Sequence, residues 1–137
     1  MNIYFCGSIR GGRNLAPIYR GLIEMLGTYG RVLTEHLGSD EEIEQKDRIL
    51  KDTQIHDRDM QWISESDVLV AEVTVPSLGV GYEIGRAVEM RKPVLCIFQE
   101  GTEFTLSAMI AGSDLVETRY YGSLEEADRL FKKYFKK

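Results

Sequence analysis

Short apolar runs alternate with amphipathic stretches along this chain, and this alternation restricts the possible folds more than any other feature of the sequence. Apolar runs of strand length lie at 3–7, 31–36, 67–73, 94–98 and 115–121. Amphipathic stretches of helical length lie between and after them, at 17–30, 49–66, 77–91 and 123–137. Such alternation is typical of parallel strands joined by crossover helices.

The run DVLVAEV at 67–73 is almost continuously apolar, as expected for a strand that is covered on both faces. We therefore predict an α/β fold: one domain over residues 1–137, with an open, mainly parallel, five-stranded sheet and helices on both faces, in a Rossmann-like or flavodoxin-like arrangement. The acidic stretch 38–47 is interpreted as a solvated loop or the approach to a helix, and 100–114 as a long irregular segment. Ser123 and Glu126 have the spacing of a capping box at the start of the last helix.

Charge and hydrophobicity exclude several classes of partner. The 137 residues include 17 Lys and Arg and 22 Asp and Glu, a net charge of -5, so no surface for nucleic acid polymers is expected. No apolar run approaches the roughly 18 residues that span a bilayer, so no membrane contact is expected either. Because Met1 leads directly into the first strand without a charged leader, we predict a cytoplasmic protein.

Cysteines and histidines give no sign of a disulfide or a metal site. Cys6 and Cys96 lie ninety positions apart inside strand-like runs, and we predict buried, reduced thiols. The two histidines, His36 and His56, belong to no spacing that is typical of metal ligands. We therefore predict that the protein needs neither a metal nor an organic cofactor.

A glycine-rich loop with two arginines follows the first strand. Ligands of open parallel sheets bind at the carboxyl ends of the strands, which makes this loop a candidate site. Its residues are Gly7, Ser8, Ile9, Arg10, Gly11, Gly12 and Arg13. Glycines permit a tight turn of main-chain N–H groups and arginines favour an anion, so we predict a phosphate site. The spacing matches neither G-x-G-x-x-G nor the Walker pattern, and a purely structural turn is the alternative.

A carboxylate lies on the apolar face of the predicted helix 49–66. Asp59 follows Ile55 by four residues and precedes Trp62 by three, so it shares their face. A buried, ionised carboxylate is costly without partners. Asp59 should therefore either accept hydrogen bonds in the core or at a cap, or work in a pocket, and the sequence leaves these alternatives open.

A second carboxylate lies near the start of the glycine-rich helix in PSLGVGYEIGRAVEMRKP, residues 76–93. If the helix begins at Ser77 or Gly79, Glu83 lies near its first turn, where the helix dipole would keep it ionised and nucleophilic. A glutamate that only stabilises the helix dipole is the alternative. Glu72, at the end of the third strand-like run, is a rival candidate for the same crevice.

Two acids that meet beside an anion site are suited to cleaving a bond to an anomeric carbon, where one carboxylate attacks the sugar and the other serves the leaving group. The chain also resembles a known family in six blocks: YFCGSIRGGR (4–13), VLTEH (32–36), IHDRDMQWI (55–63), SDVLVAEVTVPSLGVGYEIGRAV (66–88), KPVLCIF (92–98) and LSAMI (106–110). Together they are similar to the 2'-deoxynucleoside 5'-phosphate N-hydrolase family, within the nucleoside 2-deoxyribosyltransferase superfamily.

The resemblance implies roles for individual residues. Glu83 matches the family's nucleophile, Asp59 its general acid/base, and Tyr4 a pocket residue that should crowd the 2' side of the sugar. Positions 8–13, Ser77 and Gly79 match residues that hold the 5'-phosphate and sugar, and His36 matches a pocket-lining position. Ser107, Ala108 and Met109 fall in LSAM, where Ser107 and Met109 match residues that reach into the neighbouring subunit's site. The resemblance therefore implies a homodimer that acts on a small nucleotide.

The implied activity is hydrolysis of 2'-deoxynucleoside 5'-monophosphates to free base and 2-deoxyribose 5-phosphate, through a covalent intermediate on Glu83. A ribonucleotide N-glycosidase, for example one that acts on CMP, would share both acids, and CMP against dCMP would separate the two. A deoxyribosyltransferase would pass the sugar to an added base. A non-catalytic nucleotide sensor would bind the monophosphate and release no base.

Overall fold

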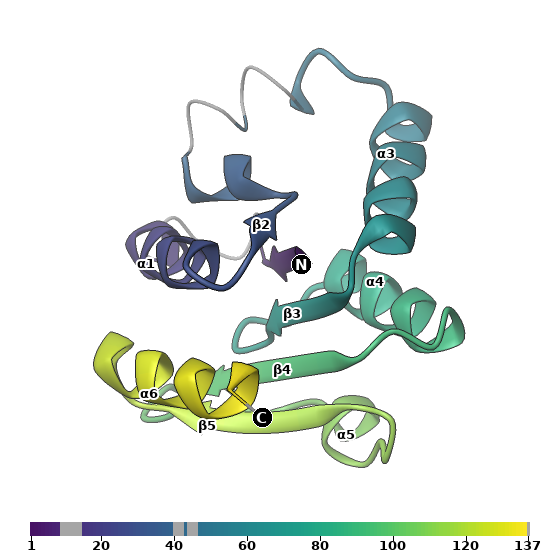
Figure 1. The fold of residues 1–137 in the computed structure, drawn as a ribbon. Helices are drawn as coiled ribbons and strands as arrows, with labels where there is room; N and C mark the ends of the chain where they lie inside the picture. The colour runs from purple at the N-terminus through teal and green to yellow at the C-terminus, as the bar shows by residue number, and fades with distance from the viewer. Residues whose placement is uncertain (9–14, 40–42, 44–46, 137) are drawn as a thin grey trace.

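The structure is a computed structural model that describes residues 1–8, 15–39, 43 and 47–136, with one sheet between two layers of helices (Figure 1). In chain order, the elements are β1 (Asn2–Gly7), α1 (Ala16–Gly27), β2 (Arg31–Val32), η2 (Glu35–Gly38), α3 (Asp52–Glu65), β3 (Val68–Glu72), α4 (Leu78–Glu89), β4 (Val94–Gln99), α5 (Ala108–Ala111), β5 (Glu117–Tyr121) and α6 (Leu124–Phe135). The alternation of strands and helices is as the sequence predicts.

The sheet has five strands in the order β2-β1-β3-β4-β5, and every pair of neighbours is parallel. This confirms the predicted α/β class and gives the flavodoxin-like order. The chain crosses from β1 outward to β2 and then back across β1 to β3, so the order of the strands switches between β1 and β3. Ligands of such sheets bind outside the carboxyl ends at this switch.

Alternation along β1 assigns its side chains to two separate cores. Ile3 and Phe5 pack in the core that α1 and α6 cover, whereas Tyr4 and Cys6 pack in the core that α3 and α4 cover. Successive strand residues point to opposite faces, so this division follows from the period of the strand. Tyr4 and Cys6 therefore project toward α3 and α4, on the face of the sheet where the site lies.

The second strand is shorter than the predicted 31–36. After β2 the chain turns at Leu33 and Thr34 and enters the 3-10 helix η2. The Thr34 hydroxyl accepts a hydrogen bond from the Phe5 N–H at 3.0 Å and donates one to the Phe5 carbonyl at 2.6 Å. The Thr34 hydroxyl thus replaces the backbone groups with which a longer β2 would bond to Phe5. The backbone can therefore leave the sheet, and it places His36 in the interior, at 1% exposure.

In the C-terminal half, β4, β5 and α6 lie where the sequence predicts two strands and a final helix. Ser123 caps α6 by accepting a hydrogen bond from the Glu126 N–H at 3.2 Å, and Glu126 accepts one from the Gly122 N–H, one residue before the expected position. The predicted irregular segment 100–114 contains one short helix, α5, whose cap is Ser107.

Both predicted thiols, Cys6 and Cys96, are buried and free. Within the described part of the chain, no helix has the length and apolarity needed to cross a membrane.

Candidate active site

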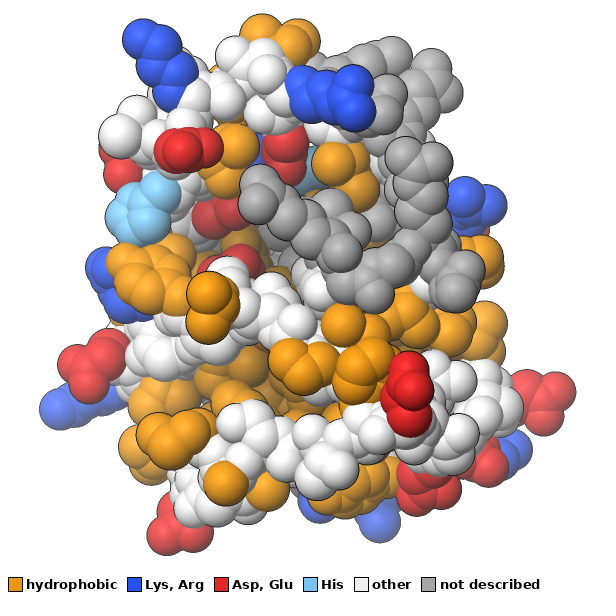
Figure 2. Space-filling view, turned by 180° about the vertical axis from the view of Figure 1, so that it is seen from behind, with side chains coloured by type: hydrophobic (Ala, Val, Ile, Leu, Met, Phe, Trp, Pro, Cys, Tyr) orange, Lys and Arg blue, Asp and Glu red, His pale blue; other side chains and the backbone are white. Residues whose placement is uncertain are grey.

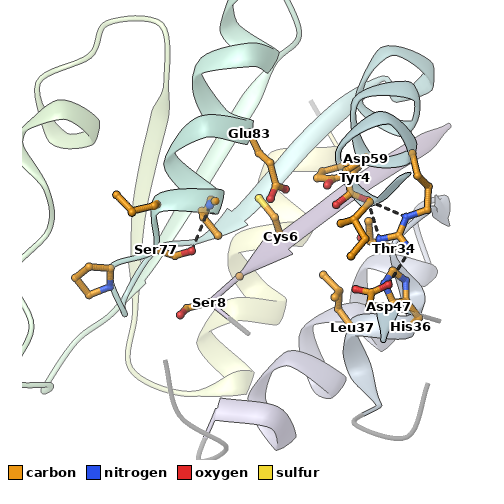
Figure 3. Close-up of a pocket in the computed structure, with 17 residues that line it drawn as sticks. Tyr4, Cys6, Ser8, Thr34, His36, Leu37, Asp47, Asp59, Ser77 and Glu83 are labelled. Atoms are coloured by element: carbon orange, nitrogen blue, oxygen red, sulfur yellow. Dashed lines mark hydrogen bonds and ion pairs between the residues drawn. The ribbon is translucent and has the colours of Figure 1, made fainter. Parts of the chain in front are cut away.

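A cavity of about 580 Å³ opens at the carboxyl end of β1, between η2, α3 and the start of α4. Figure 2 shows this face of the molecule, with acidic side chains inside a hollow, and Figure 3 shows the side chains that face it. The lining residues are Tyr4, Cys6, Gly7, Ser8, Thr34, His36, Leu37, Asp47, Ile55, Arg58, Asp59, Pro76, Ser77, Leu78, Gly79, Val80 and Glu83. Both predicted acids therefore line one cavity.

Glu83 reaches this cavity from α4. Ser77 caps the helix by accepting a hydrogen bond from the Val80 N–H at 3.3 Å. Glu83 lies five residues after Leu78, the first helical residue, and so belongs to the second turn. It therefore lies just beyond the first turn near which it was predicted, where the effect of the helix dipole has weakened. Burial raises the pKa of Glu83 to about 7, although the neighbouring Tyr4 hydroxyl opposes the rise.

Tyr4 and Cys6 project from β1 into the same cavity, with Cys6 beside Glu83 and Tyr4 beside Asp59 (Figure 3). Both residues are 2% exposed. Burial, and then the charge of Glu83, raises the pKa of the Tyr4 hydroxyl and of the Cys6 thiol far above neutrality. Both groups therefore stay protonated beside the Glu83 carboxylate, where each can donate a hydrogen bond to it.

Asp59 is neither a core hydrogen-bond partner nor a helix cap, because its side chain faces the cavity from α3. Its Oδ1 atom lies 3.0 Å from Arg58 Nε and 2.9 Å from Arg58 Nη2. Burial raises the pKa of Asp59, and the Arg58 charge opposes this rise. The two acids of the cavity are therefore both partly desolvated carboxyl groups, and each prefers its neutral form more than a solvated carboxyl does.

Glu72, the rival candidate, lies on the opposite face of the sheet. It follows Val70 by two residues, and its side chain meets Tyr19 and Tyr121 in the core beneath α1 and α6. Its Oε1 atom accepts hydrogen bonds from the Thr74 N–H and hydroxyl groups. Only 1% of the residue is exposed, and it does not line the cavity. The structure therefore excludes Glu72 as a partner of Asp59.

The predicted phosphate loop is described only at its start. Gly7 and Ser8 line the cavity, as do Ser77 and Gly79 from the β3–α4 connection. Residues 9–13, which are Ile9, Arg10, Gly11, Gly12 and Arg13, lie outside the described ranges. A side chain at Gly7 would place its Cβ atom 2.7 Å from the Tyr19 ring, so only glycine fits where the strand ends.

The remaining predicted site residues divide between two cavities. His36 lines the first cavity from η2. Ser107 and Met109 line a second cavity of about 490 Å³ between α4 and α5, and Ala108 begins α5 next to it. This second cavity shares its rim with the first, since Pro76, Ser77, Leu78 and Val80 line both.

Sequence reasoning missed several lining residues. Cys6 could have been found from Tyr4, because strand residues two apart share a face. Asp47 and Arg58 gave no such signal: Asp47 belongs to an acidic stretch interpreted as solvated, and Arg58 is held at the cavity by its ion pairs with Asp47 and Asp59. Throughout the described residues, no cluster of His, Cys, Asp and Glu side chains could hold a metal ion.

A flavodoxin-like sheet whose switch point holds a cavity with two desolvated carboxyl groups defines an α/β protein with a site for a small ligand. The chain belongs to the nucleoside 2-deoxyribosyltransferase family, whose model matches residues 3–127. This confirms the resemblance found in the sequence.

The sequence is also similar to individual members of this family, and the fold to a solved structure. A 5-hydroxymethyl-dUMP N-hydrolase from Danio rerio is 49% identical over 138 residues, which cover 98% of this chain and 96% of that protein. A protein from Nematostella vectensis, provisionally named 2'-deoxynucleoside 5'-phosphate N-hydrolase 1, is 49% identical over 127 residues, covering 92% of this chain and 86% of that one. The structure of the Clostridium botulinum CMP N-glycosidase BcmB superposes with a TM-score of 0.66 at 17% identity, over 98% and 99% of the chains, and supports the fold alone.

Proposed function

We propose that this protein is an N-glycosidase that hydrolyses 2'-deoxynucleoside 5'-monophosphates to free base and 2-deoxyribose 5-phosphate. One observation supports this most strongly: Glu83 and Asp59 line the same cavity in a chain that is 49% identical, over 98% of its length, to a nucleotide N-hydrolase. Two carboxyl groups on one cavity are what cleavage at an anomeric carbon requires.

Glu83 acts as the nucleophile. Its carboxylate attacks C1' of the sugar as the bond to the base stretches through an oxocarbenium-like state, which leaves a deoxyribosyl ester on Glu83. Asp59 gives its proton to the departing base. It then takes a proton from water, whose oxygen attacks C1' and releases Glu83 together with 2-deoxyribose 5-phosphate. No cofactor enters these steps.

The reacting form of the cavity has one proton on the pair, with Glu83 ionised and Asp59 neutral. Both pKa values are raised by burial, and the charge of Asp59 raises that of Glu83 further. The two groups therefore titrate as a coupled pair, and the pH dependence of the rate describes the pair as a whole. Loss of this one remaining proton leaves the pair without an acid, so activity should decline above about pH 7.

The start of the glycine-rich loop and the cap of α4 form the proposed phosphate end. Ser8 and Ser77 offer hydroxyl groups there, and Gly79 leaves room, since an added Cβ atom would meet only ordinary contacts at 3.8 and 3.9 Å. Binding energy from the phosphate would position the sugar, so a nucleoside without it should react slowly. Tyr4 would crowd the 2' position and favour deoxyribose.

We also propose a homodimer in which Ser107 and Met109 complete the partner's site. Met109 is 83% exposed and Leu78, on the shared rim of the two cavities, is 97% exposed. Apart from the chain neighbours and the backbone of α4 itself, no described residue lies within 4 Å of a Cβ atom added at Gly81 or Gly85, although both line the second cavity. An apolar groove with exposed hydrophobic rims and bare backbone suits a second copy of the chain. The free, buried thiols fit a cytoplasmic location.

The test is a substrate panel in which released base is resolved by chromatography. Deoxynucleoside monophosphates should be cleaved, while CMP and unphosphorylated nucleosides should react at least about tenfold more slowly. Added free base should not change the products, which separates hydrolysis from transfer. Binding of deoxynucleotides without any base release would contradict the proposal and favour a sensor.

A further inference from the structure

Arg58 lies between two carboxylates that line the cavity with it, those of Asp47 and Asp59. Its Nη1 atom donates to Asp47 Oδ1 at 2.7 Å, while Nε and Nη2 both contact Asp59 Oδ1, at 3.0 and 2.9 Å. The three side chains are only 17–20% exposed, so the charges are shielded from water more than in a surface ion pair. One cation thus joins the segment before α3 to the proposed acid/base.

Further contacts fix the plane of the Arg58 guanidinium. Its Cζ atom lies 4.7 Å from the centre of the Trp62 ring, which is one turn further along α3. Asp47 in turn lies against His36, with 3.6 Å between Oδ1 and Nε2, and the His36 side chain is 2% exposed. A guanidinium that both stacks on a ring and makes several directed hydrogen bonds cannot be replaced by a lysine ammonium without losing this geometry.

Both contacts from Arg58 fall on one oxygen of Asp59. Oδ1 is therefore engaged, and Oδ2 is the atom that would exchange a proton with the base and the water. We infer that Arg58 is a positioning residue for Asp59, and that Asp47, through Arg58, controls which oxygen of Asp59 faces the substrate and how readily it holds a proton. This inference rests on the proposed function, in which Asp59 is the acid/base.

Titratable groups from several elements surround Asp59 or line the cavity with it. Arg58 and His56 belong to its own helix and lower its pKa, whereas Asp47 raises it. Facing it across the cavity are Glu83 from α4, Tyr4 from β1 and His36 from η2. Removing a positive or a negative charge from the Arg58–Asp47 pair should therefore move the pKa of Asp59 in opposite directions.

The experiment compares Asp47→Asn, Arg58→Gln and Arg58→Lys with the wild-type protein. The primary readout is the titration of the Asp59 carboxyl carbon by ¹³C NMR, which needs no enzymatic activity. We expect the midpoint to fall in Asp47→Asn and to rise in Arg58→Gln. With an active substrate, the descending limb of the kcat/KM profile should move in the same directions. Arg58→Lys should lower kcat about tenfold with little change in KM.

Asp52→Asn is the matched control. Asp52 lies at the start of the same helix and is exposed, so this variant also removes one negative charge without touching Arg58 or His56. Its Asp59 midpoint and kcat should equal those of the wild type. Should Arg58→Gln fail to fold, the fall in Asp47→Asn and the kcat loss in Arg58→Lys still decide the matter. Unchanged midpoints, or shifts in one common direction, would overturn the inference; a wild-type protein that cleaves no nucleotide but shows opposite shifts would contradict only the proposed function.

Discussion

Glu72 and Glu83 are both desolvated glutamates near the carboxyl ends of the strands, yet they lie on opposite faces of the sheet. Glu72 is sealed beneath α1 and α6 with the Thr74 hydroxyl and two tyrosines. Glu83 faces an open cavity across from Asp59. Burial raises the pKa of both carboxyl groups, so a raised pKa alone does not separate them.

The two glutamates differ in whether a ligand in the cavity can reach them. Glu72 is 1% exposed and has a hydroxyl and an N–H donor on one oxygen, so its role is to satisfy polar groups where β3 ends. The buried Oε2 atom of each glutamate has no hydrogen-bond partner among the described residues, but only Glu83 lines the cavity. An unsatisfied carboxylate oxygen beside a cavity is costly for folding and is suited to attack on a ligand.

The largest expected effect is loss of activity in Glu83→Gln. The amide keeps the shape of the side chain but cannot form the glycosyl ester, so kcat should fall on the order of 10⁴-fold or more. Base release under single-turnover conditions measures it. Glu72→Gln is the matched control and should keep kcat within about threefold. Equal losses in the two variants would remove the distinction between the faces.

A smaller loss, with a change in pH profile, is expected for Asp59→Asn. Loss of general acid/base assistance should lower kcat about 10² to 10⁴-fold. The wild-type kcat/KM should decline above about pH 7, where the substrate's phosphate is already dianionic, because the pair loses its last proton. The residual activity of Asp59→Asn should lack this decline. A wild-type rate that instead rises through pH 8 would mean that the base departs without a proton from Asp59.

The third effect concerns stability and singles out Glu72. Truncation in Glu72→Ala leaves the Thr74 hydroxyl and N–H without their acceptor and opens a cavity in the core, which should cost about 3 kcal/mol of unfolding free energy. Urea denaturation measures the loss. Because Glu72 lies outside the cavity, the folded fraction should retain its kcat. A fully stable Glu72→Ala protein would show that the sealed cluster contributes nothing to folding.

The smallest effect is a pH-dependent gain of stability in Glu83→Gln. The pKa of Glu83 is about 7 in the folded state against an ordinary 4.5, so its contribution to stability is fully present below about pH 4.5 and is lost as the pH rises through 7. The glutamine does not titrate. Glu83→Gln should therefore exceed the wild type by on the order of 2 kcal/mol at pH 8 and match it at pH 4 in thermal denaturation. A gain that is the same at both pH values would point to packing instead.

Much of the fold could be predicted because hydrophobic periodicity is a local signal. Runs such as 67–73 and 94–98 needed only their own composition to be assigned as strands. The end of β2 could not be predicted in this way, because it depends on Thr34 bonding to the backbone of β1, 29 residues away in sequence. Threonine has a good intrinsic propensity for strands, so the tertiary contact of Thr34 overrides its local preference.

The site could be predicted in part, for a related reason. Both acids were found from their unusual position on apolar or glycine-rich helices. Their charge states could not be predicted, because the pKa of Glu83 depends on its burial in the folded protein and on opposing hydrogen bonds from Tyr4 and Cys6, which belong to another element. The Asp47–Arg58 pair was missed because an ion pair between residues eleven apart leaves no periodic trace in the sequence.

Locating the covalent intermediate would show directly which glutamate attacks the sugar. A reaction of the wild-type protein with a deoxynucleoside monophosphate would be quenched in acid within the first turnover and digested, and the adduct mapped by fragmentation mass spectrometry. We expect one deoxyribose 5-phosphate on Glu83 and none on Glu72, with no adduct in Glu83→Gln. An adduct on Glu72, or rapid base release with no adduct on any residue, would contradict the role of Glu83 as the nucleophile.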